Sequence, residues 1–317
     1  MVRKTSKVSV IGAGNVGSAV AYALVLLHEC QEVVLFDRKL SKAEGAAWDI
    51  DDVIPLLAEM DITPSSDFDD LKDSDVIIVT VGKNPEKGQT RLDILGENAE
   101  IIASTMKELD NVAPNSVVII VSNPVDPLTR IAIEASSRSE SLIFGSGTVL
   151  DTSRLRSQLG KRLNVNLADI HVYVVGEHGE SAFAVWSSAL VGGIRLEDFC
   201  TYTGEAIEKI KNECMELTIK RAYDISERKG YTNYGIAVAV SQLVGSVLRD
   251  EKKIFTVSVK SLADYGIGDE VVLCLPCIIG KEGVVRKLLL SRNGEEQHLL
   301  EQSAARLQEA YSSCNRD

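Results

Sequence analysis

The sequence of 317 residues lacks features that mark several common classes of protein. It has no excess of positive charge. The net charge of -12 and an isoelectric point near 5.0 argue against nucleic acid or an anionic membrane as a partner. No run of about 18 apolar residues occurs, so no membrane-spanning helix is predicted. No secretory signal is visible in the polar first residues, and we therefore expect a cytoplasmic protein.

The six cysteines form no cluster with histidine, and we predict reduced thiols and no metal site. Cys274 and Cys277 have the CxxC spacing, but they lie in the apolar run 271–279. A buried structural strand is the favoured interpretation of that run. Redox or metal chemistry is the alternative.

No low-complexity linker and no internal repeat interrupts the chain, whose length suits about two domains. In the first half, short β-rich apolar runs alternate with helical patterns. This alternation predicts a doubly wound, parallel α/β sheet of the Rossmann type. The expected strands cover residues 7–11, 32–36, 75–81, 116–121 and 141–144; the expected helices cover 15–28, a segment starting at Ser41 with Glu44 as its capping-box partner, and about 92–109.

The second half has a different pattern, typical of an α+β domain. One long helix is expected over residues 204–229. Antiparallel strands are expected over 253–260 and 270–279, and apolar residues at helical spacing predict a final amphipathic helix. We place the domain boundary near residue 147, giving domains 1–147 and 148–317 with a sizeable shared interface.

A dinucleotide-binding fingerprint follows the first expected strand. Gly12, Gly14 and Gly17 form a GxGxxG motif that opens a helix, and Asp37 ends the second strand 20 residues later. The glycines allow the backbone to approach a pyrophosphate at a helix N-terminus. Asp37 can accept hydrogen bonds from ribose hydroxyls and would repel a 2′-phosphate, which favours NAD over NADP. A tight turn without a ligand is the alternative.

Three residues could together reduce a 2-oxo acid. His178, within Gly-Glu-His-Gly, can change its charge near neutral pH and donate a proton. Asp151 could orient the imidazole, and the planar guanidinium of Arg154 suits a carboxylate. Taken alone, the histidine could be an ordinary loop residue. The segment around Asp151 could equally be a helix start, with Asp151 as N-cap and Arg154 solvated.

Arg91 ends a polar segment, residues 82–91, that follows a buried strand and contains two glycines. Such a segment is typical of a lid at the carboxyl end of a sheet. On closing, Arg91 could polarise the substrate carbonyl while water is excluded. A solvated surface loop is the alternative.

Taken in order, these motifs resemble the lactate/malate dehydrogenase family and, within it, the L-lactate dehydrogenase branch. The resemblance covers nearly the whole chain. It rests on the residues 12–17, 121–126 (Val-Ser-Asn-Pro-Val-Asp), 145–148 (Gly-Ser-Gly-Thr), 150–154, 176–179 and 230–232 (Gly-Tyr-Thr).

The resemblance implies an NAD-dependent oxidoreductase with His178 as acid/base, Asp151 as its partner, Arg154 as carboxylate clamp and Arg91 as lid arginine. It implies that the cofactor binds first. Asn123 would bind the substrate beside the nicotinamide, and Thr232 would line the pocket. Further implied cofactor contacts are Val16, Lys42, Gly82, Val121, Asn123 and Ser146.

The segment departs from the family pattern at Pro85, the position that selects the substrate. Members of the lactate dehydrogenase branch usually have Gln at this position, and malate dehydrogenases have Arg. Malate would leave its second carboxylate without a matching cation, which costs several kcal/mol when desolvated. Pro85 suits a methyl or a longer alkyl group. A 2-hydroxyisocaproate-type dehydrogenase is therefore the main alternative, and malate dehydrogenase ranks below it.

Two further basic residues match an allosteric phosphate site. Arg156 and His171 fall where allosteric bacterial lactate dehydrogenases, enzymes of glycolysis, hold fructose bisphosphate at a subunit interface. The resemblance implies a homotetramer, or dimers coupled into one by this phosphate site. Both side chains suit phosphate. A solvated helix arginine and a strand-start histidine are the alternative interpretation.

Overall fold

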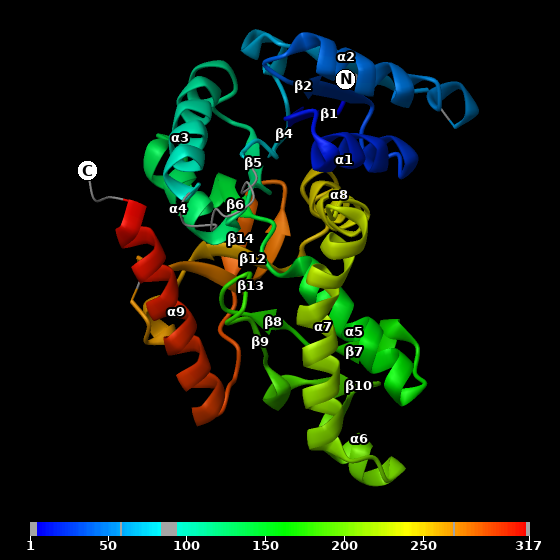
Figure 1. The fold of residues 1–317 in the computed structure, drawn as a ribbon, viewed down its shortest axis with the longest axis vertical. Helices are drawn as coiled ribbons and strands as arrows, with labels where there is room; N and C mark the ends of the chain where they lie inside the picture. The colour runs from blue at the N-terminus through cyan, green and yellow to red at the C-terminus, as the bar shows by residue number, and fades with distance from the viewer. Residues whose placement is uncertain (1–4, 58, 84–93, 269, 315–317) are drawn as a thin grey trace.

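A nine-stranded sheet runs through the computed structural model, which describes residues 5–57, 59–83, 94–268 and 270–314 (Figure 1). Its order is β14-β13-β12-β6-β5-β4-β1-β2-β3, and the strands from β1 to β6 run parallel. The order 3-2-1-4-5-6 confirms the predicted doubly wound fold. The parallel strands are β1 (Lys7–Ile11), β2 (Glu32–Phe36), β3 (Asp61–Ser65), β4 (Val76–Val79), β5 (Val117–Ile120) and β6 (Ile143–Gly145).

Alternating side chains of the parallel strands enter two different hydrophobic cores. In β4, Val76 and Ile78 belong to one core, whereas Ile77 and Val79 belong to the other. Successive residues of a strand point to opposite faces, so a sheet covered on both faces needs apolar residues at every position. This is why the strands could be recognised as continuous apolar runs.

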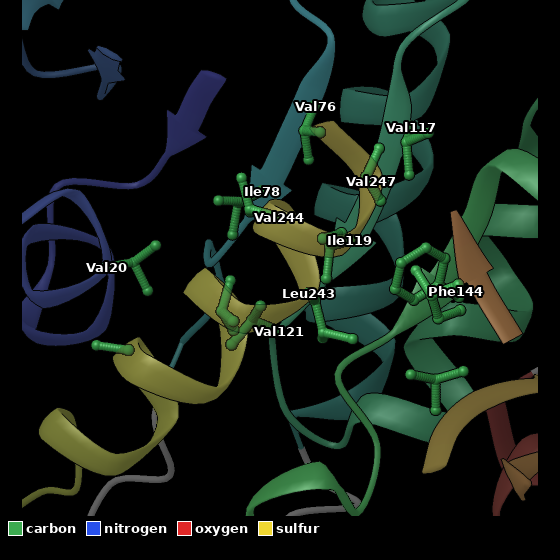
Figure 2. Close-up of a cluster of buried hydrophobic side chains, with 14 of the residues drawn as sticks. Val20, Val76, Ile78, Val117, Ile119, Val121, Phe144, Leu243, Val244 and Val247 are labelled. Atoms are coloured by element: carbon green, nitrogen blue, oxygen red, sulfur yellow. The ribbon is translucent and has the colours of Figure 1, made fainter. Parts of the chain in front are cut away.

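Helices cover both faces of this sheet. Buried residues of α1, α2 and α8 share the core of Val76, and those of α3 and α4 share the other core. Figure 2 shows Leu243, Val244 and Val247 of α8 among side chains of β4 and β5. A helix from the second half of the chain therefore completes the core of the first half. The bounds are α1 (Asn15–Leu26), α2 (Leu40–Asp51), α3 (Leu95–Val112), α4 (Val125–Ala135) and α8 (Tyr234–Leu248).

The antiparallel strands expected in the second half are confirmed, but they extend the parallel sheet. Ser258 of β12 pairs with Gly145 of β6, and β13 and β14 follow outward. Cys274 and Cys277 are buried in β13 as predicted, and their odd spacing directs them to opposite faces of the strand. The bounds are β12 (Lys253–Lys260), β13 (Val272–Gly280) and β14 (Gly283–Lys287).

A third hydrophobic core joins helices of the second half to short strands outside the large sheet. The helix α9 passes beside α4 and ends the described chain (Figure 1). Among the described residues, no helix is both long and apolar enough to cross a bilayer. The remaining elements are α5 (Val149–Leu163), α6 (Leu196–Thr203), α7 (Ile207–Lys229), α9 (Gly294–Cys314), β7 (Ile170–His171), β8 (Val174–Val175), β9 (Phe183–Ala184), β10 (Leu190–Val191) and β11 (Ile194–Arg195).

Two predicted helix starts are wrong. The N-cap of α2 is Lys39, without a side-chain cap, and Ser41 lies inside the helix. The carboxylate of Asp37 accepts the Lys39 N–H at 3.0 Å and turns the chain into the helix earlier. Gly204 does not begin the long helix: with φ of 76° it is the left-handed C-cap of α6.

Candidate active site

The residues predicted to hold the cofactor all follow parallel strands at the carboxyl edge of the sheet or lie on the helix that comes next. Because neighbouring parallel strands end at the same edge, segments distant in sequence meet there. The site spans the point between β1 and β4 where the strand order reverses, the usual ligand position in such sheets. The segments follow β1 (Gly12, Gly14, Val16, Gly17), β2 (Asp37, Lys42), β4 (Gly82), β5 (Val121, Asn123) and β6 (Ser146).

The glycine turn fits a pyrophosphate. Gly12 has a φ of 105°, and a Cβ on Gly17 would lie 1.7 Å from the Gly12 carbonyl oxygen. Glycine is therefore required at both positions to bring α1 against β1. Gly14 is the N-cap of α1 and provides no side-chain cap, and a Cβ there would meet only Lys42 Nζ, at 3.8 Å. The first-turn N–H groups thus face a space in which an anion can be bound.

Asp37 is held in position for a ribose. One carboxylate oxygen accepts the backbone N–H of Ala13 at 3.0 Å, and the other accepts that of Lys39. Lys42 Nζ lies 3.5 Å from Asp37. Each carboxylate oxygen has further lone pairs for ribose hydroxyls. The described residues therefore fit NAD as the predicted cofactor.

Asp151 and Arg154 lie on one face of the first turns of α5. The Asp151 carboxylate contacts both Arg154 and His178. Arg154 Nη1 donates to Asp151 Oδ1 at 3.0 Å, and Asp151 Oδ2 lies 2.7 Å from His178 Nδ1. The histidine comes from the loop between β8 and β9. The N-cap of α5 is Thr148, so the alternative with Asp151 as N-cap and a solvated Arg154 is wrong.

This arrangement favours a charged imidazole beside an ionised carboxylate. Burial lowers the pKa of His178, but the Asp151 carboxylate outweighs it and holds the pKa above its ordinary value. Burial raises the pKa of Asp151, yet His178 and Arg154 together keep it below its ordinary value. The His178 side chain remains 29% exposed, so a bound molecule can reach the ring. With Nδ1 held by Asp151, Nε2 is the nitrogen available for proton transfer.

A cavity of about 180 Å³ brings the two halves of the chain together. The first half contributes Val16, Val121, Asn123 and Ser146, and the second half contributes Asp151, Arg154, His178 and Thr232. Much of the remaining wall is apolar, with Met215, Ile219 and Ile236. An acid-binding group, an acid/base and the predicted cofactor contacts therefore share one space.

Two residues that support this site, Asn98 and Asp126, are assigned no role by the motifs above. Asn98 is fully buried, accepts the Lys83 N–H at 2.7 Å, and donates to the carbonyls of Lys83 and Asn123. It thereby joins the segments after β4 and β5. Asp126 accepts the backbone N–H of His178 at 2.7 Å. The sequence signal for Asn98 is a polar residue within an otherwise apolar helix face, whereas Asp126 is the last residue of the 121–126 motif, which assigned it no role.

Two of the predicted site residues, Arg91 and Pro85, lie outside the described residues. The predicted phosphate residues are described. Arg156 Nε donates to the Val172 carbonyl at 3.4 Å, and its guanidinium lies 5.7 Å from the Tyr173 ring centroid. His171 is exposed in β7, next to Val172 in the chain. No group of three or more potential metal ligands occurs in the described part of the chain.

The chain matches two family models along nearly its whole length. Residues 6–145 match the lactate/malate dehydrogenase NAD-binding domain. Residues 148–315 match the lactate/malate dehydrogenase alpha/beta C-terminal domain.

Relatives and solved structures agree with these matches. The chain is 40% identical to the L-lactate dehydrogenase of Treponema denticola, covering 99% of this chain and all of that protein, and 40% identical to that of Clostridium perfringens, covering 96% of each. Its structure resembles that of a lactate dehydrogenase from a Medee basin deep-sea metagenome library, with a TM-score of 0.94 and 34% sequence identity. The match covers 98% of this chain and 99% of that one. It also resembles the minor L-lactate dehydrogenase of Enterococcus mundtii, with a TM-score of 0.94 and 30% sequence identity over 99% of each chain. The chain therefore belongs to the lactate/malate dehydrogenase family of NAD-dependent oxidoreductases.

Proposed function

We propose that this protein is an L-lactate dehydrogenase that interconverts pyruvate, NADH and a proton with L-lactate and NAD⁺. One observation carries the proposal: His178, Asp151 and Arg154 are hydrogen-bonded in series on the wall of a cavity that also reaches Val16 and Asn123. The names of the similar proteins from Treponema denticola and Clostridium perfringens support the same activity.

In this proposal His178 moves the proton. When bound, the cofactor supplies a hydride to the carbonyl carbon. The protonated Nε2 of His178 donates to the carbonyl oxygen, and in the reverse direction the neutral ring accepts the hydroxyl proton. Asp151 holds Nδ1 throughout, which fixes the ring orientation and stabilises the imidazolium.

The substrate carboxylate is assigned to Arg154, whose planar fork carries further N–H donors beyond the one on Asp151. Asn123 binds the substrate beside the nicotinamide, and Thr232 lines the methyl end. Arg91 polarises the carbonyl when the segment with Pro85 closes. The residues assigned to NAD are those of the glycine turn, Asp37, Lys42, Gly82, Val121 and Ser146.

A second candidate, a 2-hydroxyisocaproate-type dehydrogenase, is favoured by the apolar cavity wall with Met215, Ile219 and Ile236. Such a wall accepts a branched alkyl group as well as a methyl group. Malate is disfavoured because, among the described lining residues, Arg154 is the only lysine or arginine. A second carboxylate buried there would lack a cationic partner among the described lining residues, since Arg154 is assigned to the first.

The proposal extends to assembly and regulation. Arg156 and His171 would bind fructose bisphosphate between subunits of a homotetramer, and the bond from Arg156 to the carbonyl of Val172, the residue after His171, supports this. The NAD-binding and catalytic domains would be residues 1–147 and 148–317. The enzyme would act in the cytoplasm, in glycolysis.

Oxidation of NADH is the direct test, with pyruvate, 2-oxoisocaproate and oxaloacetate, each with and without fructose bisphosphate. We expect pyruvate to give the highest kcat/KM and fructose bisphosphate to activate. A preference for 2-oxoisocaproate would replace lactate by the second candidate. Absence of activation would contradict the proposed fructose bisphosphate site but would leave the proposed lactate dehydrogenase activity in place.

A further inference from the structure

Asp126 is a buried carboxylate directly behind the histidine loop. It lies in the first turn of α4 and is only 1% exposed. A carboxylate removed from water in this way must be hydrogen-bonded, and it is stabilised further when charged groups or dipoles compensate it. The positive end of the α4 helix dipole lies at this first turn and favours a negative charge there.

Groups that can donate hydrogen bonds surround both oxygens of Asp126. Oδ2 accepts the backbone N–H of His178 at 2.7 Å. Oδ1 accepts the Ser258 hydroxyl at 2.6 Å and the Cys274 thiol at 3.2 Å. Burial raises the pKa of Asp126, while these donors and the charge of His178 oppose the rise. A set of three donors suits an ionised carboxylate, which accepts hydrogen bonds and donates none.

The backbone before His178 is fixed from three elements. The Gly176 N–H donates to the Cys274 carbonyl of β13 at 3.1 Å, and the Glu177 N–H donates to Ser303 Oγ of α9 at 2.7 Å. The His178 N–H then donates to Asp126 of α4. Three consecutive amides are thus anchored, and Asp126 is the charged acceptor among these partners.

The charges around His178 leave a role for a second carboxylate. From α5 the ring faces Asp151, which raises the pKa of His178, and Arg154, which lowers it by less. Glu177, next to His178, is paired with Arg306 at 3.5 Å. Asp126 on α4 contacts the His178 backbone, and its charge also raises the pKa of the ring; among the described residues it forms no ion pair with Lys or Arg. Its charge therefore balances an imidazolium.

We propose that Asp126 is a positioning residue for His178, anchoring its backbone N–H and placing a second buried negative charge behind the imidazole. The proposal rests on the proposed function, in which His178 is the acid/base, and adds a carboxylate outside the cavity to it. Asp126 does not touch the substrate. It acts through the loop geometry and through the protonation of His178.

Asp126→Asn tests this because it keeps the shape and removes the charge. We expect the pKa of the His178 imidazole, followed by NMR titration of the four histidines without ligands, to fall by about one pH unit. Reduction needs the protonated ring, so its upper pH limit should move down equally. Above that limit kcat should fall about tenfold while the Kd of NADH stays unchanged. Oxidation of the hydroxy acid should extend to lower pH.

An unchanged His178 pKa, with kcat lowered equally at every pH, would overturn the proposal. If Asp126→Asn does not fold, Ser258→Ala replaces it: loss of this donor raises the pKa of Asp126 and favours its neutral form, so the His178 pKa should fall in the same direction but less. The matched control is Cys277→Ser, a buried change on the opposite face of β13 from Cys274, which should leave the His178 pKa in place. Because the titration needs no substrate, it stands even if the pyruvate assay fails.

Discussion

At the scale of single residues, Arg154 serves two groups at once. Its Nη1 holds Asp151, and the proposal assigns its other donors to the substrate carboxylate. A lysine ammonium cannot present the same planar fork. For Arg154→Lys we expect the KM for the oxo acid to rise roughly 30- to 100-fold, the equivalent of about 2–3 kcal/mol of charge-assisted hydrogen bonding. The Kd of NADH should stay the same.

Steady-state kinetics and a fluorescence titration with NADH measure both quantities for Arg154→Lys. Arg162→Lys is the control, because Arg162 is on the same helix and pairs with Glu205 near the surface. It should behave like the unchanged protein. An unchanged KM for the oxo acid in Arg154→Lys would contradict the proposal that Arg154 binds the substrate carboxylate.

The sequence predicted His178, Asp151 and Arg154 because each has the chemistry that a 2-oxo acid requires. The sequence also predicted that Asp151 orients His178, 27 residues away, but the contact itself forms only where α5 meets the loop after β8, with Asp151 Oδ2 2.7 Å from His178 Nδ1. Asn98 carries no comparable signal, and Asp126 was noticed only as the last residue of the 121–126 motif, without a role. Their importance comes from burial among donors and acceptors of other elements, which composition does not reveal.

At the scale of elements, the contact between β1 and α1 depends on Gly17. A Cβ there would overlap the Gly12 carbonyl, which is backbone and cannot rotate away. We expect Gly17→Ala to lower the free energy of unfolding by about 3 kcal/mol or more and to abolish NADH binding. Gly45→Ala in α2 is the matched control, since no described atom outside its chain neighbours and its own helix backbone lies within 4 Å of the Cβ position. It should stabilise by about 0.5–1 kcal/mol.

Urea denaturation gives both stabilities, and NADH fluorescence gives the binding. Equal behaviour of the two alanine variants would contradict the close contact at Gly17.

The predicted bounds of β1, β2 and β12 agree with the structure, whereas β4 and β5 are shorter than predicted and β6 begins two residues later. The strand β3 was not predicted because it lies at the edge of the sheet and contains Pro64, and a proline argues against a central strand. The start of α2 was misplaced because a side chain from the preceding strand end, Asp37, replaced the expected cap. Local patterns therefore predicted part of the elements, and contacts between elements decided where several of them begin.

At the scale of the whole molecule, one sheet crosses the predicted domain boundary. β12 pairs with β6, and α8 packs on α1 and on the parallel strands. We expect the two halves to unfold together. Amide hydrogen exchange measured by mass spectrometry should give peptides of β5 and β13 the same free energy of opening, within about 1 kcal/mol.

The helix α6 provides the internal comparison, because it packs on the third hydrophobic core outside the large sheet. Its amides should open at lower free energy than those of β5. Distinct values for β5 and β13 would mean that each half is stable alone.

The sheet order also bears on how the protein behaves at high concentration. A sheet of nine strands has only two edges, here β3 and β14, at which a second molecule could add a strand. Pro64 removes one backbone donor from the first edge, and Arg286 and Lys287 place positive charge along the second. Both open ends of the sheet thus oppose edge-to-edge aggregation, and the long apolar strands between them stay shielded from neighbouring molecules.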